Sequence, residues 1–204
     1  MTDDESDINR HHAAKMAKKK VVRDKILAAK TEERGLLIVH TGKGKGKTTA
    51  AMGMALRCIG HGMKVGIVQF VKGARATGER AVFARFPDLC VVEASGEGFT
   101  WETQDRARDM VLAAGAWQAA QAMMADSSFR MVILDEINIV LRYAYLDFDA
   151  VLAALKNRPQ ALHVVVTGRN AREELIEAAD LVTEMALVKH PFRAGVKAQA
   201  GIEY

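Results

Sequence analysis

The residues best suited to chemistry lie in one short run, Thr41–Thr49, whose sequence is TGKGKGKTT. Its alternating glycines let successive backbone N–H groups turn toward one anion, because no Cβ atom obstructs them. Lys47 adds a positive charge, and the Thr48 hydroxyl is suited to Mg²⁺. We therefore predict nucleotide binding, with a surface turn as the alternative. The residues predicted to hold the phosphates are Gly42, Lys43, Gly44, Lys45, Gly46, Lys47, Thr48 and Thr49.

The glycine spacing of this run departs from the usual phosphate-binding loop (P-loop) pattern, G-x-x-x-x-G-K-[ST]. That pattern places its first glycine where this chain has Thr41, and the glycine comes one residue later, at Gly42. The residues before the run favour a strand and those after it favour a helix, which is the context that a P-loop requires.

Two carboxylates form the second group of candidates, because Asp135 and Glu136 directly follow the apolar segment Met131–Leu134. In P-loop folds we expect this strand to lie beside the P-loop strand, so that its acids face bound Mg²⁺. Asp135, Glu136 and Thr48 are therefore the predicted metal ligands. The alternative is a helix-capping Asp and a solvated Glu.

A third candidate is the segment Gly96–Glu102, which contains Phe99 and Trp101 between a predicted strand and a predicted helix. Loops at this place border the binding sites of open α/β sheets. Only 6% of the chain is aromatic, so two aromatic residues on one glycine-containing loop favour a flat ligand. The alternative is a loop that folds its aromatic side chains onto the core.

Two further segments follow predicted strands. Gln69–Gly73 could contact a ligand or only turn the chain. Lys189–Tyr204 is basic and too polar for a core, which predicts that it borders the site, with a plain surface tail as the alternative.

The elements that must position these residues alternate between short apolar runs and longer helical patterns, as in β-α-β units. This alternation predicts an α/β fold with a mainly parallel sheet. The predicted strands are Leu36–His40, Val65–Phe70, Cys90–Glu93, Met131–Leu134, Leu162–Thr167 and Leu181–Val188. The predicted helices are Lys47–Ile59, Thr103–Ala125, Phe148–Lys156 and Ala171–Ala178, the last with Asn170 as N-cap.

Composition and charge separate an N-terminal arm from a globular body. The 204 residues are 50% hydrophobic, which fits one domain with a real core and excludes a disordered chain. Residues 1–7 carry four acids, and residues 8–30 carry eight Lys or Arg against one acid, whereas the remainder is nearly neutral. We predict a polar arm over residues 1–34, partly helical or disordered, and a domain over residues 35–204. A nearly neutral domain argues against nucleic-acid binding.

The cysteines and the apolar runs indicate the cellular compartment in which the protein is expected. Cys58 and Cys90 lie in apolar surroundings without other ligands at metal-binding spacing, which favours buried thiols in a reducing environment. The chain has no apolar run of the ~20 residues that a membrane-spanning helix needs. We therefore expect a cytoplasmic protein without a membrane partner.

Taken together, these motifs resemble the ATP:corrinoid adenosyltransferases of the P-loop type. The resemblance covers the chain from about Gly35 to Tyr204. The family's own P-loop has its first glycine displaced by one residue in the same way. The arm is not matched by it. The segments that carry the resemblance are Thr41–Thr49, Val68–Gly73, Gly78–Arg80, Gly98–Gln104, Leu134–Glu136, Thr167–Arg169 and Lys189–His190.

The resemblance implies transfer of the 5′-deoxyadenosyl group of ATP to the Co(I) centre of a reduced corrinoid, cobalamin or cobinamide, with triphosphate as leaving group. It implies that Thr48 and Glu136 coordinate Mg²⁺ or Mn²⁺, that Lys47 balances charge, and that ATP lies in the P-loop in the opposite sense to ordinary ATPases. Phe99 and Trp101 match the aromatic residues that lie against the lower face of the corrin. Catalytic roles are thereby assigned to Lys47, Glu136, Phe99 and Trp101.

The same resemblance implies a RecA-like P-loop NTPase fold, with six strands, helices on both faces and an antiparallel edge strand near Leu181. It also implies a homodimer and a flavoprotein reductant as partner. The competing hypothesis is an ordinary P-loop ATPase or kinase that cleaves the γ-phosphate, with Glu136 polarising water and Gln104 or Arg169 assisting. A non-enzymatic alternative is an ATP-gated nucleic-acid binder that uses the basic arm.

Overall fold

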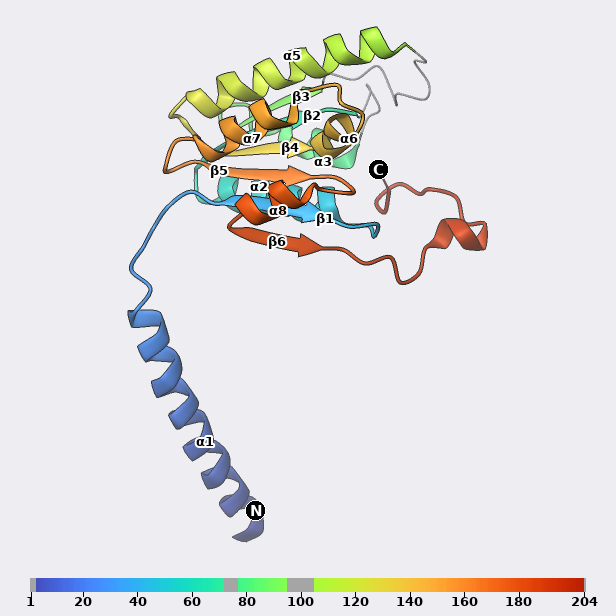
Figure 1. The fold of residues 1–204 in the computed structure, drawn as a ribbon. Helices are drawn as coiled ribbons and strands as arrows, with labels where there is room; N and C mark the ends of the chain where they lie inside the picture. Colours follow the sequence, from blue (N-terminus) through green and yellow to red (C-terminus); the bar gives the residue numbers. More distant parts are fainter. Residues whose placement is uncertain (1–2, 72–76, 95–104, 204) are drawn as a thin grey trace. The chain divides into compact units, whose positions relative to one another are not determined.

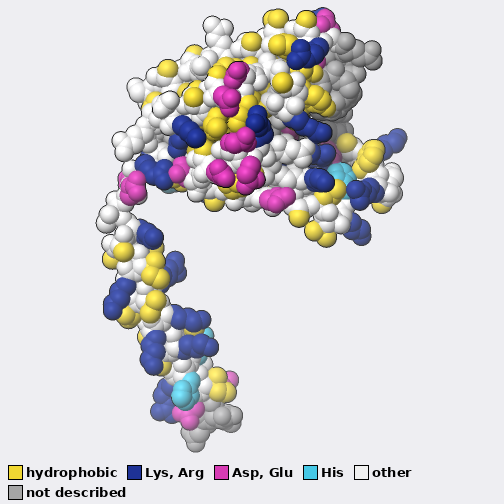
Figure 2. Space-filling model, in the orientation of Figure 1, with side chains coloured by type: hydrophobic (Ala, Val, Ile, Leu, Met, Phe, Trp, Pro, Cys, Tyr) yellow, Lys and Arg dark blue, Asp and Glu magenta, His cyan; other side chains and the backbone are white. Residues whose placement is uncertain are grey.

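The computed structural model describes residues 3–71, 77–94 and 105–203. The chain forms two compact units, Met1–Glu33 and Arg34–Tyr204. The first unit contains one long helix, α1 (Asp3–Ala28). Lys and Arg side chains follow α1 along its length, as Figure 2 shows. No helix among the described residues combines the length and the apolar character needed to cross a membrane.

The second unit is built on one six-stranded parallel sheet, with the strand order β3-β2-β4-β5-β1-β6 (Figure 1). Every strand pair in it is parallel. The strands are β1 (Leu37–Thr41), β2 (Lys64–Gln69), β3 (Cys90–Ala94), β4 (Phe129–Asp135), β5 (His163–Thr167) and β6 (Leu181–Glu184). This sheet confirms the predicted α/β, RecA-like P-loop fold.

Helices cover both faces of the sheet because successive strand residues point to opposite sides. Ile38, Ile67 and Ile133 pack beneath α2 (Lys47–Gly60) and α3 (Gly78–Phe83). Val39 and Leu134 belong to the core on the other face. The helices on that face are α5 (Arg106–Ala125), α6 (Ile137–Arg142), α7 (Phe148–Lys156) and α8 (Glu173–Ala178).

The edge strand β6 is parallel to β1, so the expected antiparallel edge strand is wrong. Its register runs from Ile38 opposite Leu181 to Thr41 opposite Glu184. The reason is the crossover through α8, which returns the chain to the amino edge of the sheet before β6 begins. The strand also ends at Glu184, four residues before the predicted end.

The strand with the two carboxylates does not lie beside the P-loop strand, which corrects a second expectation. β5 separates β4 from β1 and pairs with both. Val164, Val165 and Val166 of β5 are fully buried, and a strand that is apolar on both sides is stable in the middle of a covered sheet.

The N-cap of α8 also differs from the expectation. Arg172, not Asn170, occupies this position, and it makes no side-chain cap hydrogen bond. Asn170 instead adopts a left-handed backbone with φ of 55° in the turn after β5. Asparagine tolerates this conformation better than most residues, so the same residue type that suits a cap also suits this turn.

Candidate active site

The backbone of the P-loop explains the displaced glycine. Thr41 is the last residue of β1, and its hydroxyl accepts a hydrogen bond from the Ala171 N–H at 3.1 Å. The loop turns one residue later, at Gly42, whose φ is 95°. A Cβ atom at Gly42 would lie 2.6 Å from the Met185 carbonyl oxygen. Glycine is therefore required at position 42 and not at position 41.

Lys47 begins α2, and its ammonium group folds back over the loop. The Nζ atom donates hydrogen bonds to the carbonyl oxygens of Gly42 at 2.9 Å and Gly44 at 2.6 Å. Burial lowers the pKa of Lys47, and the nearby Arg169 and Lys45 lower it further, whereas Glu136 raises it. A bound polyanion would reverse the effect of these like charges, so the loop is electrostatically prepared for one.

Asp135 lies fully buried at the end of β4, behind the P-loop threonine. Its Oδ1 atom accepts hydrogen bonds from the hydroxyls of Thr48 and Thr167, each at 2.8 Å. Its Oδ2 atom accepts one from Gln69 Nε2 at 3.2 Å. Asp135 is thus a fixed acceptor that orients the Thr48 hydroxyl.

Glu136 takes a different position from its neighbour, although the two residues are adjacent in the chain. Its backbone is left-handed with φ of 62°, and its N–H donates to Thr167 Oγ1 at 2.9 Å. Its side chain lines the cavity above the P-loop. Thr167 therefore contacts both acids at once, through a hydroxyl that donates to Asp135 and accepts from Glu136.

Thr167 and Gln69 are partners of Asp135 that the sequence motifs do not indicate. Each is a polar residue that ends an apolar strand, and each is at most 3% exposed. A polar residue at the carboxyl end of a buried parallel strand is a signal that could have singled out both.

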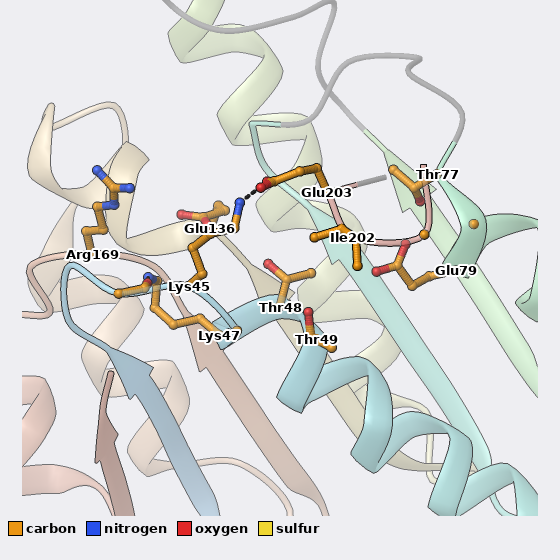
Figure 3. A pocket seen from close by; sticks show the side chains of 14 residues that line it. Lys45, Lys47, Thr48, Thr49, Thr77, Glu79, Glu136, Arg169, Ile202 and Glu203 are labelled. Atoms are coloured by element: carbon orange, nitrogen blue, oxygen red, sulfur yellow. Dashed lines mark hydrogen bonds and ion pairs between the residues drawn. The ribbon is translucent and has the colours of Figure 1, made fainter. Parts of the chain in front are cut away.

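The cavity has a volume of about 420 Å³ and opens at the carboxyl edge of the sheet (Figure 3). Lys45, Lys47 and Arg169 bring three cationic side chains to it, beside Thr48 and Glu136. Of the predicted phosphate-binding residues, six line the cavity, namely Gly44, Lys45, Gly46, Lys47, Thr48 and Thr49. Gly42 and Lys43 belong to the same loop but not to this lining, and Asp135 lies beneath it.

The donor set around Thr48 fits a hard divalent cation. The hydroxyl proton of Thr48 points to Asp135, which leaves the oxygen lone pairs for another partner. The Glu136 carboxylate lines the same cavity. Mg²⁺ is commonly held by one or two protein oxygens together with substrate phosphates, so a hydroxyl and one carboxylate are a suitable protein contribution.

The C-terminal segment also reaches the cavity, as the sequence predicted for the basic tail. Gly201, Ile202 and Glu203 are among the lining residues. Figure 3 shows the ion pair between Lys45 Nζ and Glu203 Oε2, which joins this segment to the P-loop.

Several predicted site residues lie outside the described part of the chain. They are Phe99 and Trp101, together with Gln104, Lys72 and Gly73. Thr77 and Glu79, near α3, are described and line the cavity. Glu79 belongs to the segment Gly78–Arg80, which is one of those that carry the family resemblance.

Similarity to known protein families shows to which family of P-loop proteins the chain belongs. The family described as ATP:corrinoid adenosyltransferase BtuR/CobO/CobP matches residues 33–204. The chain belongs to this family. The family described as cob(I)alamin adenosyltransferase N terminal matches residues 1–27, so the similarity to adenosyltransferases extends over the arm, beyond the region covered by the sequence motifs.

Curated relatives support the same assignment over nearly the full length. The chain is 60% identical over 195 residues to a corrinoid adenosyltransferase of Sinorhizobium sp, which covers 95% of this chain and 91% of the relative. It is 54% identical to the corrinoid adenosyltransferase of Pseudomonas aeruginosa, with coverage of 96% and 97%. Among solved structures, a RadB recombinase matches 76% of each chain at 16% identity, with a TM-score of 0.47.

Membership of the corrinoid adenosyltransferase family also establishes the reaction. The enzyme transfers the 5′-deoxyadenosyl group of ATP to the cobalt of a reduced corrinoid, and the competing assignment as an ordinary ATPase or kinase is not favoured.

Proposed function

We propose that this adenosyltransferase binds the triphosphate of ATP in the cavity above its P-loop and orients C5′ of the ribose toward the corrinoid. The observation that carries the proposal is the convergence of Lys45, Lys47 and Arg169 on one cavity. Glu79, Glu136 and Glu203 line the same cavity, but the cations stand beside the P-loop, whose backbone N–H groups suit a leaving group with several negative charges better than a neutral ligand.

The reaction needs charge compensation more than proton transfer. The electron pair of Co(I) attacks C5′, the bond between C5′ and the α-phosphate oxygen breaks, and that oxygen keeps the bonding pair. An alkyl–cobalt bond and free triphosphate result, and no proton is transferred. Because Co(I) is already a strong nucleophile, the protein contributes mainly by orienting C5′ and stabilising the departing oxygen.

Lys47 has the central role in this proposal. Its ammonium group donates hydrogen bonds to the carbonyls of Gly42 and Gly44, and phosphate oxygens would replace these partners. Thr48 and Glu136 would hold Mg²⁺, which reduces the charge of the triphosphate, and Asp135 would orient Thr48. The backbone N–H groups from Gly42 to Thr49 would complete the phosphate site.

For the corrinoid we propose a site at Phe99 and Trp101, supported by the family pattern of the loop sequence. Aromatic side chains against the lower corrin face would exclude an axial base, which eases reduction of Co(II) to the reactive Co(I). We propose a flavoprotein as the electron donor.

Three broader properties belong to the same proposal. We propose a catalytic domain over residues 35–204, with the arm as a separate element. We also propose a homodimer, on the basis of family resemblance. A cytoplasmic location is supported by Cys58 and Cys90, which are both buried free thiols, as expected in a reducing compartment.

The decisive experiment follows the fate of the phosphates. Mg²⁺, ATP and chemically reduced cobalamin are incubated with the enzyme, and ³¹P NMR is recorded together with the corrinoid absorbance. We expect triphosphate to form in step with a light-sensitive alkylcobalamin, because attack at C5′ releases all three phosphates joined together.

The control reaction omits the corrinoid. Formation of ADP and phosphate at the same rate without corrinoid would contradict the proposal, because cleavage of the γ-phosphate does not need a cobalt nucleophile.

A further inference from the structure

Glu203 is an acidic residue at a site built for an anion. Its carboxylate pairs with Lys45 Nζ, and its side chain is only 18% exposed. It lines the same cavity as Lys47 and Arg169 (Figure 3). A carboxylate therefore occupies one of the three cationic positions that a triphosphate would use.

We propose that Glu203 is an intramolecular competitor of the polyphosphate for Lys45, and that it sets how tightly ATP and the leaving triphosphate are held. The inference rests on the proposed function, because it requires that the cavity bind the triphosphate. It assigns to the C-terminus a role in the affinity of the phosphate site.

The electrostatics of Lys45 support this competition. Burial lowers its pKa, and the positive charge of Arg169 lowers it further, so the ammonium group gains from a nearby negative charge. Glu203 supplies a compensating negative charge beside Lys45. A polyanion that binds Lys45 makes this carboxylate redundant and also repels it, so the two anions exclude each other at Lys45.

The C-terminal segment is attached in a way that allows Glu203 to leave. The N–H groups of Ile202 and Glu203 donate to the Gln199 carbonyl at 3.2 and 2.9 Å, so they form a local turn. Residues 197–202 are exposed, and the Ile202 side chain is 75% exposed. A local turn with little buried apolar surface can swing away as a unit at small cost, and the ion pair is the contact that a phosphate would replace.

The consequence concerns product release. When the bond to C5′ breaks, the α-phosphate oxygen gains a negative charge, so free triphosphate is more negative than the triphosphate group of ATP. The cations of the cavity would therefore hold the product tightly. When the carboxylate returns to Lys45, it removes one cation from the product's contacts and favours its departure. Glu203 would then weaken the binding of ATP and of triphosphate together.

The experiment measures binding of inorganic triphosphate to the full chain by isothermal titration calorimetry, in the presence of Mg²⁺. We expect Glu203→Gln to bind triphosphate about two- to tenfold more tightly than the wild type, in the range of a partly exposed ion pair. Glu177→Gln is the matched control, because it makes the same charge change at an exposed position of α8 away from the cavity lining.

A double-mutant comparison identifies Lys45 as the contested group. On a Lys45→Gln background, the additional Glu203→Gln substitution should change triphosphate affinity less than twofold, because the competed cation is gone. A full effect of Glu203→Gln without Lys45 would show that the carboxylate acts only through the general field, and would overturn the proposal.

The remaining outcomes are also decisive. Unchanged or weaker triphosphate binding by Glu203→Gln, while the wild type binds normally, would refute the competition but leave the phosphate site intact. If the wild type itself bound no triphosphate, the proposed function of the cavity would fail instead. Hydrogen exchange of residues 199–203 should rise when triphosphate is added. A fall would overturn the proposal, because the segment would then close over the ligand and not leave Lys45.

Discussion

Charged residues are arranged differently at the two ends of the strands in the central sheet, called here the amino edge and the carboxyl edge. At the amino edge, Asp180 accepts a hydrogen bond from the Leu37 N–H at 2.8 Å and pairs with Arg158 at 3.0 Å and Arg34 at 2.7 Å. At the carboxyl edge, Lys47 donates to backbone carbonyls, and its pKa is lowered chiefly by burial and further by Arg169 and Lys45, whereas Glu136 raises it. Opposite charges are thus paired directly at one edge, whereas at the other three cations gather and only Lys45 has an ion pair, with Glu203.

The difference separates stability from function within one set of strands. Paired charges at the amino edge favour the folded state without any ligand. Clustered cations at the carboxyl edge disfavour it, and the same repulsion becomes favourable binding free energy once a polyanion arrives. Substitutions at the amino edge should therefore change mainly the free energy of unfolding, and substitutions at the carboxyl edge should change mainly turnover.

The largest effect should come from Lys47→Ala. Loss of a charged contact to the leaving group should reduce turnover by about 10²–10³-fold, which corresponds to ~3–4 kcal/mol of transition-state stabilisation. The free energy of unfolding should change little, because the loss of the hydrogen bonds to Gly42 and Gly44 opposes the relief of repulsion from other cations. Steady-state kinetics and urea denaturation measure both quantities. Normal turnover would contradict the assignment of the P-loop.

Thr167→Val should give an intermediate effect on both observables. It removes the hydroxyl that bonds to Asp135 and Glu136 while keeping the side-chain shape. Unsatisfied buried groups cost about 1–3 kcal/mol of stability, and a less fixed Glu136 should weaken Mg²⁺ use. We expect a higher Mg²⁺ requirement in the adenosylation assay. Thr167→Ser, which keeps the hydroxyl, should restore it, and failure of this rescue would show that packing alone matters.

The smallest effect should come from Asp180→Asn, which should change only the free energy of unfolding. The pKa of Asp180 is lowered from its ordinary value near 3.8, chiefly by the Arg34 hydrogen bond. A lowered pKa stabilises the folded state above the ordinary value, and this contribution disappears as the pH falls through the lowered pKa. Because the pair is partly exposed, we expect a loss of only about 1 kcal/mol at neutral pH.

The pH profile tests the cause of this effect. The difference in unfolding free energy between the wild type and Asp180→Asn should shrink as the pH falls from neutrality to below 4. Turnover per folded enzyme should stay unchanged. A stability difference that does not depend on pH would mean that hydrogen bonding, and not charge, stabilises this edge.

The sequence alone determined the local parts of this protein. The glycines and Lys47 specify a strand, a phosphate loop and a helix, because backbone sterics and helix-terminal N–H groups act within a few residues. The apolar periodicity located every strand of the sheet to within a few residues, and helix α7 at its predicted bounds. The sequence therefore predicts the P-loop run and the two carboxylates by residue number.

Only the tertiary structure decided how distant segments meet. It placed β5 between β1 and β4, made β6 parallel, and brought Thr167 to Asp135 and Glu203 to Lys45. These contacts join residues 32 and 158 positions apart. Strand order and such pairings depend on the packing free energy of the whole sheet, which no local pattern encodes, because any buried apolar strand satisfies the same periodicity.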